Sequence, residues 1–155
     1  MLLLRNLLWI VLLPGVIAGY VPWRFYGLAH ARPNLTNPID LIALVVIAAG
    51  IALLAACVWE FATRGRGTLS PVDPPRDLVV QGLYRYVRNP MYLAVSTILL
   101  GESLLLRSLA LLGYWAIVFV AFNLFVMLYE EPTLARQFGE SYERYRRDVG
   151  RWLPR

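Results

Sequence analysis

The chain has 155 residues, of which 59% are hydrophobic and only 16% charged, and its mean hydropathy is +0.56. This composition excludes an ordinary soluble domain, and the length excludes more than one compact unit, so the sequence predicts a small integral membrane protein. The net charge is +5 and all 15 basic residues are arginines gathered in particular loops, which indicates orientation in a membrane rather than nucleic-acid binding. One cysteine, Cys57, and one histidine, His30, exclude an internal disulfide framework, and we predict no metal site and no His-based triad.

The first two apolar runs are interpreted as membrane spans over residues 2–22 and 39–62. The first resembles a signal peptide because Arg5 precedes a long apolar stretch, but it continues into Trp23 without a small-residue cleavage site. We therefore expect a transmembrane helix that is kinked at Pro14. The second run is long enough to cross a hydrocarbon core of about 30 Å.

A polar loop over residues 63–90 precedes two further predicted spans, over residues 91–106 and 109–129. Only Arg107 and Ser108 separate these spans, so they are expected to form an antiparallel hairpin that returns the chain to the membrane face it left at Pro90. Glu102 interrupts the third run. It is either a functional group at membrane depth, or a surface-accessible carboxylate near the turn or one paired with Arg107.

The tail carries apolar side chains at helical spacing, which predicts an amphipathic helix over residues 133–149. Pattern alone favours equally an interfacial anchor and a lid folded over a site at the membrane surface. The arginine distribution places the loop 63–90, the tail and both termini in the cytoplasm. The predicted fold is therefore all-α: a polytopic membrane protein with about four transmembrane helices and a C-terminal amphipathic interfacial helix in a single domain.

The segment over residues 82–92 (GLYRYVRNPMY) joins the polar loop to the third apolar run. Pro90 has no backbone N–H and disfavours helix at Asn89, so a helix is expected to begin at about Pro90. The free N–H groups and positive end of that helix would face the arginine-rich side, which favours an anionic group or a polar cofactor as ligand.

Three stretches follow one another in order: residues 78–92 (LVVQGLYRYVRNPMY), Glu130 with Glu131 after one helical hairpin, and residues 138–145 (FGESYERY). Together they resemble the C-terminal catalytic half of the isoprenylcysteine carboxyl methyltransferase and phospholipid methyltransferase group, over about half of the chain. The resemblance implies an integral membrane enzyme that transfers a methyl group from S-adenosylmethionine to a small lipophilic or lipid acceptor. The cofactor-binding residues that it implies are Asp77, Leu78, Val79, Tyr84, Asn89, Pro90, Met91, Tyr92 and Glu130.

Arg88, Tyr92 and Glu130 are the residues for which we predict catalytic roles. S-adenosylmethionine presents a carboxylate, an ammonium, ribose hydroxyls, an adenine and a sulfonium. A helix start at Pro90, the Glu130 carboxylate and the aromatic rings of Tyr84 or Tyr92 match these groups. Methyl transfer mainly requires that two substrates be positioned and water excluded, so no metal or catalytic histidine is needed.

Two positions depart from the family pattern. Asn89 stands where the family motif has histidine, so acid–base chemistry at that position is absent. Val126 stands where the prenylcysteine enzymes place an arginine that holds the substrate carboxylate, which weakens carboxyl methylation and leaves an amine, thiol, phenol or phospholipid headgroup open as acceptor. Two alternatives remain at this level, a membrane reductase that uses NADPH and a non-enzymatic scaffold or transporter subunit, and the oligomeric state is left open.

Overall fold

The structure is a computed structural model that describes residues 11–64, 78 and 80–155, and the regular secondary structure of these residues is helical, with no β-strand. The elements in chain order are η1 (Val11–Tyr20), α2 (Val21–Phe25), η2 (Leu28–His30), α3 (Pro38–Arg64), η3 (Gly82–Arg85), α4 (Pro90–Leu105), α5 (Leu109–Phe125), η4 (Val126–Glu130), α6 (Glu131–Phe138) and α7 (Glu140–Asp148). η1 and η4 are π-helical, whereas η2 and η3 are 3₁₀ turns. The all-α prediction is confirmed.

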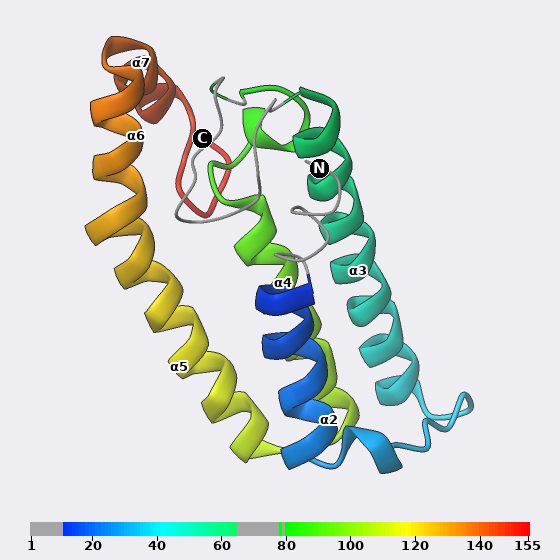
Figure 1. The fold of residues 1–155 in the computed structure, drawn as a ribbon. Helices are drawn as coiled ribbons and strands as arrows, with labels where there is room; N and C mark the ends of the chain where they lie inside the picture. Colours follow the sequence, from blue (N-terminus) through cyan, green and yellow to red (C-terminus); the bar gives the residue numbers. More distant parts are fainter. Residues whose placement is uncertain (1–10, 65–77, 79) are drawn as a thin grey trace.

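Two stretches are long and apolar enough to cross a membrane, Pro38–Glu60 in α3 and Leu109–Phe138 through α5, η4 and α6. α4 is apolar but has 16 residues, which gives a length of about 24 Å, shorter than a typical hydrocarbon core. Residues 1–10 of the predicted first span lie outside the described residues, and Pro14, where a kink was expected, lies within η1. In Figure 1 the helices stand side by side, and α6 and α7 lie beside the C-terminal end of the chain.

α3 and α4 approach each other closely because each carries a glycine at the contact. A Cβ atom added to Gly50 would lie 2.9 Å from the backbone nitrogen of Ile98, and one added to Gly101 would lie 3.0 Å from that of Ile47. Small residues of this kind let helix backbones pack against each other where lipid removes the usual hydrophobic drive for association. α3 and α4 therefore form a closely packed pair.

The hairpin between α4 and α5 turns at Arg107 and Ser108, as predicted. Arg107 has a φ of 49°, which is unusual for a residue with a side chain, and Ser108 caps α5 by accepting a hydrogen bond from Leu111 N–H at 3.1 Å. Arg107 donates to the Asp40 carboxylate of α3 at 2.6 Å rather than to Glu102. Glu102 is 4% exposed, so the expectation of a surface-accessible or Arg107-paired carboxylate is wrong.

The tail differs from the single helix expected over residues 133–149. The helix that begins in α5 continues through η4 into α6 and ends at Phe138, and α7 begins at Glu140. Gly139 separates them with a φ of 53°, a conformation that glycine adopts without strain. The apolar spacing of the tail runs across this break, so the periodicity alone did not reveal it.

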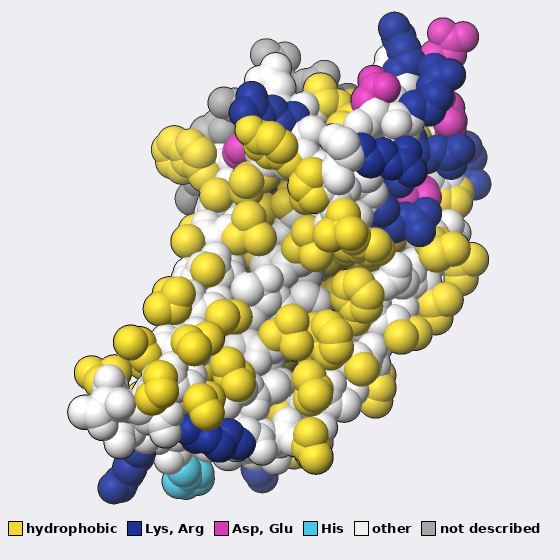
Figure 2. Space-filling view, turned by 180° about the vertical axis from the view of Figure 1, so that it is seen from behind, with side chains coloured by type: hydrophobic (Ala, Val, Ile, Leu, Met, Phe, Trp, Pro, Cys, Tyr) yellow, Lys and Arg dark blue, Asp and Glu magenta, His cyan; other side chains and the backbone are white. Residues whose placement is uncertain are grey.

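Large apolar side chains cover the outer faces of α3, α5 and η4, with Val45 60%, Ile117 71% and Leu128 74% exposed. Figure 2 shows hydrophobic side chains over the middle of the molecule, with arginine and acidic side chains gathered at one end and a smaller basic group at the other. This distribution is that of a protein whose middle lies in lipid and whose ends lie in water.

Candidate functional site

The site is built where the start of α4 meets the end of η4. Tyr92, in the first turn of α4, donates its hydroxyl to Glu130 Oε2 at 2.9 Å. Its ring also packs against Phe122 of α5, with ring centroids 4.7 Å apart. Two predicted site residues that are 38 positions apart in the sequence are thus in direct contact. The hairpin geometry inferred from the short turn at Arg107 explains this, because it brings both chain segments to one end of the bundle.

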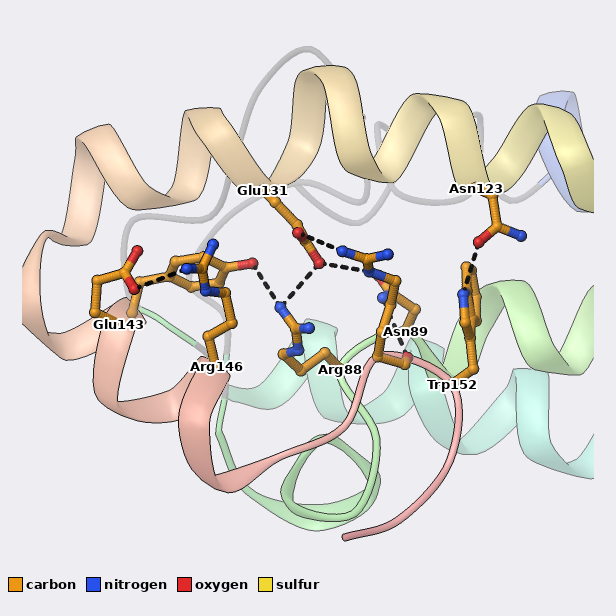
Figure 3. Close-up of polar contacts among 9 residues, drawn as sticks. Arg88, Asn89, Asn123, Glu131, Glu143, Arg146 and Trp152 are labelled. Carbon is orange, nitrogen blue, oxygen red and sulfur yellow. Dashed lines mark hydrogen bonds and ion pairs between the residues drawn. The ribbon is translucent and has the colours of Figure 1, made fainter.

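A buried charge cluster lies next to this contact (Figure 3). The Glu131 carboxylate accepts two hydrogen bonds from Arg151, from Nε at 2.8 Å and from Nη2 at 2.9 Å. Arg88 donates from Nη1 to the same carboxylate at 2.9 Å and to the Tyr142 hydroxyl at 3.2 Å. Two guanidinium groups therefore share one carboxylate, and the hydrogen bonds to Glu131 raise the pKa of Arg151 above its usual value.

A short segment over residues 149–152 crosses the start of α4, and we call it the C-terminal strap. Gly150 accepts from Arg88 N–H at 2.9 Å and forms a parallel bridge with Val87, while Asn89 Nδ2 donates to the Arg151 carbonyl at 3.3 Å. A Cβ atom at Gly150 would lie 2.0 Å from the Leu153 carbonyl oxygen, so the turn after the strap requires glycine. The strap therefore holds the segment before α4 in place.

Trp152 extends from the strap into the space between α4 and α5. Its indole N–H donates to Asn123 Oδ1 at 2.8 Å, and its ring lies 5.3 Å from that of Phe119 and 6.4 Å from that of Tyr92, centroid to centroid. Asn123 is polar within an apolar helix, and docking the indole gives its carbonyl a partner, as Figure 3 shows. The strap thus joins both sides of the site.

The η3 turn also borders the site and is held by contacts with α3 and α7. Glu60, near the end of α3, accepts the Leu83 N–H with both carboxylate oxygens, at 3.1 and 3.0 Å. Tyr84 is buried, and its carbonyl accepts from the Tyr145 hydroxyl of α7 at 2.5 Å. Burial raises the pKa of the Tyr84 phenol well above its usual value, and the electrostatic influence of Cys57 and Glu130 adds to that rise.

The structure brings most of the predicted site residues together. These are Tyr84, Arg88, Asn89, Pro90, Tyr92 and Glu130, with α4 beginning at Pro90 as predicted. Met91 lies half-buried in the first turn of α4, and Leu78 is half-buried and lies outside the helices. Asp77 and Val79 lie outside the described residues.

Sequence reasoning missed several members of the site. It gave no site role to Glu60, Arg151 or Trp152, and it selected Glu130 as a site residue without predicting the contacts of Glu131. The sequence shows arginine and aromatic residues near the end of the chain, but their spacing does not indicate that this segment folds back onto α4. The described residues hold no group of three or more His, Cys, Asp or Glu side chains placed to bind a metal ion.

Three matches place the chain among known proteins. The family model described as phospholipid methyltransferase matches residues 39–141, more than half of the chain. A protein-S-isoprenylcysteine O-methyltransferase of Schizosaccharomyces pombe is 35% identical over 77 residues, which cover 50% of this chain and 33% of that relative. An uncharacterized protein of Haemophilus influenzae is 45% identical over 65 residues, which cover 41% of this chain and 100% of that relative.

The matched region contains α3, α4, the hairpin and both Glu130 and Glu131. The match covers about a third of the length of the S. pombe relative, so the two share a segment rather than a whole protein. On the family match, the chain belongs to the phospholipid methyltransferase family.

Proposed function

We propose that this chain is an integral membrane methyltransferase that takes its methyl group from S-adenosylmethionine and transfers it to a lipophilic small molecule or lipid. The observation that carries the proposal is the hydrogen bond from the Tyr92 hydroxyl to Glu130 Oε2 in a chain of this family. It joins the two parts of the motif from which the cofactor was predicted. The contact lies at the charged end of the bundle, where a water-soluble donor has access.

The described side chains fit this donor. Glu130 keeps its second carboxylate oxygen for the ammonium or the ribose hydroxyls, because Tyr92 uses only Oε2. The half-buried Tyr92 ring offers an aromatic surface for the adenine, and the first turn of α4 offers backbone N–H groups to the donor's carboxylate. Asn89 is buried and its amide nitrogen is bound to the Arg151 carbonyl, so it serves as a neutral hydrogen-bonding group rather than an acid or base.

When bound, S-adenosylmethionine would supply an electrophilic methyl group to the acceptor's nucleophile, with the neutral thioether S-adenosylhomocysteine as the leaving group. The protein's part is to align the two substrates and to exclude water. Glu130 and Tyr92 bind the donor, the strap and the rings of Phe119 and Trp152 shield the reacting region, and Arg88 binds an anionic group beside it. Tight binding of the sulfonium charge alone would not accelerate the reaction, because that charge disappears during transfer.

The acceptor is proposed to reach the site from the bilayer. Val126 is 1% exposed and lies one helical turn before Glu130. The prenylcysteine enzymes that this chain resembles have an arginine at the position of Val126, so here this position offers the acceptor no positive charge. We propose four spans with both termini and the site on the cytoplasmic face, which is supported by the arginine distribution and the apolar middle of the molecule (Figure 2).

Calorimetric titration of the detergent-solubilised protein with S-adenosylmethionine, and separately with NADPH, tests the proposal. We expect saturable binding of S-adenosylmethionine and no binding of NADPH. Binding of NADPH alone would move the chain to the membrane reductases. Binding of neither by a folded sample would favour a scaffold, and folding is checked by circular dichroism on the same preparation.

A further inference from the structure

Arg88 and Arg151 bind the same carboxylate in different ways. Arg151 uses Nε and Nη2, the two nitrogens on one edge of the guanidinium, to bind both oxygens of Glu131. Arg88 uses only Nη1, which donates to Glu131 and to Tyr142. The edge of Arg88 formed by Nε and Nη2 makes no hydrogen bond within the described part of the chain, and its Nε is fully buried.

A buried N–H without an acceptor costs free energy comparable to a lost hydrogen bond, and more when the group carries a charge. The Arg88 side chain is only 10% exposed, so water does not readily compensate it. The free edge is also the one that binds both oxygens of a carboxylate or phosphate in parallel. An oxyanion is therefore the ligand that would accept hydrogen bonds from the free N–H groups of Arg88.

The charges of the cluster agree with this. Two guanidinium groups, Arg88 and Arg151, face the single carboxylate of Glu131, which leaves one positive charge beside the start of α4. The positive end of α4 adds to it. Arg88 precedes Tyr92 by four residues and Glu131 directly follows Glu130, so the free edge lies near the contact between Tyr92 and Glu130.

From these contacts we propose that the Nε–Nη2 edge of Arg88 is an oxyanion subsite that binds a carboxylate or phosphate group of a ligand. This deepens the proposed function and rests on it for the identity of the ligand. The oxyanion is either the methionine carboxylate of the donor or the anionic headgroup of a lipid acceptor. In both cases Glu131 and Tyr142 hold the guanidinium in place through Nη1 and leave its bidentate edge to the ligand.

The test uses the full chain in detergent and three variants. Arg88→Lys keeps the positive charge and loses the bidentate edge, whereas Arg88→Gln loses both. Arg85→Lys is the matched control, because Arg85 lies three residues earlier, is exposed and stacks on Tyr86. Glu131 keeps the bidentate partner Arg151 in all three, so folding should persist, as checked by circular dichroism and thermal melting.

The first arm compares S-adenosylmethionine with decarboxylated S-adenosylmethionine by calorimetry. If the subsite binds the donor, the wild type binds the carboxylated form about ten- to a hundredfold more tightly, as expected for hydrogen bonds between charged groups. Arg88→Gln removes most of this difference, Arg88→Lys removes less of it, and Arg85→Lys retains it.

The second arm titrates dihexanoylphosphatidic acid against the wild type and the same variants, with dihexanoylglycerol as the uncharged control. If the subsite binds an acceptor headgroup, the two donor forms bind equally well, and phosphatidic acid binds with an affinity that falls at least tenfold in Arg88→Gln.

If neither the preference for the carboxylated donor nor the affinity for phosphatidic acid depends on Arg88, the proposed subsite is refuted. If the wild type binds neither donor form, the proposed function fails, and the phosphatidic acid arm still decides for or against the subsite.

Discussion

The contact between α3 and α4 gives the sharpest prediction about the fold. Replacing Gly50 by alanine would place a Cβ atom 2.7 Å from Ile98 Cγ1, 2.9 Å from Ile98 N and 3.1 Å from the Ala94 carbonyl oxygen. The two nearest backbone atoms belong to a helix and are unable to rotate away. Carbon atoms pack optimally at about 3.5–4.0 Å, so the helices must separate by roughly 0.5 Å or more at this point.

Overpacking of this kind costs about 1–3 kcal/mol, whereas replacing a helical glycine by alanine gains about 1 kcal/mol of helix propensity. Gly113→Ala in α5 measures the second effect alone, because no atom lies within 4 Å of the added Cβ there. We expect Gly113→Ala to be neutral or stabilising. Gly50→Ala should be less stable than Gly113→Ala by about 1–3 kcal/mol, which is the packing cost.

The assay is equilibrium unfolding in mixed micelles of increasing SDS content, followed by circular dichroism. Gly101→Ala is the reciprocal variant, since its Cβ would lie 2.6 Å from Ile47 Cγ1 and 3.0 Å from Ile47 N. Because either substitution separates the same pair of helices, the double variant should cost less than the sum of the single ones. Equal stabilities for Gly50→Ala and Gly113→Ala would refute the close α3–α4 contact.

Three further predictions follow from single contacts. Tyr145→Phe removes the hydrogen bond to the Tyr84 carbonyl and should lower the stability by about 1 kcal/mol and weaken S-adenosylmethionine binding; unchanged binding in calorimetry would show that this bond does not shape the site. Trp152→Phe keeps an aromatic ring but leaves Asn123 Oδ1 without its donor, so thermal melting should show a loss of about 1–2 kcal/mol, and no loss would mean that the strap is not docked through this bond. Glu102 is buried, and its Oε2 has no hydrogen-bond partner among the described residues. Glu102→Gln keeps the shape of this side chain, so both the stability and the S-adenosylmethionine affinity should remain unchanged. A loss of affinity would make Glu102 part of the site.

The sequence predicted the helices well where proline or polar residues bound an apolar run. α3 begins at Pro38 and α4 at Pro90, within one residue of the expected bounds, because proline fits the first turn of a helix and not its interior. The two-residue turn also predicted correctly that Tyr92 and Glu130 would lie at the same end. These features depend on local chemistry and chain length, both of which the sequence contains.

Other features depend on contacts that local patterns do not encode. The hydrogen-bonded residues Arg151 and Glu131 are 20 positions apart in the sequence, and Trp152 and Asn123 are 29 positions apart. Arg107 binds Asp40, which is 67 positions away, and not the nearer Glu102. The tail pattern was equally compatible with one continuous helix, and only the positive φ of Gly139 separates α6 from α7. Packing in three dimensions decided between arrangements that have the same periodicity.

Glu130, held by Tyr92, is the residue on which the proposed binding of S-adenosylmethionine depends most. Calorimetric titration of the wild type and Glu130→Gln with S-adenosylmethionine, with Glu102→Gln as the control for a carboxylate elsewhere in the bundle, tests it most directly. The account predicts saturable binding by the wild type and by Glu102→Gln, and an affinity at least tenfold lower for a folded Glu130→Gln, since a hydrogen bond to a charged group is lost. Equal affinities for the wild type and Glu130→Gln would contradict the account, as would a folded wild type that does not bind S-adenosylmethionine.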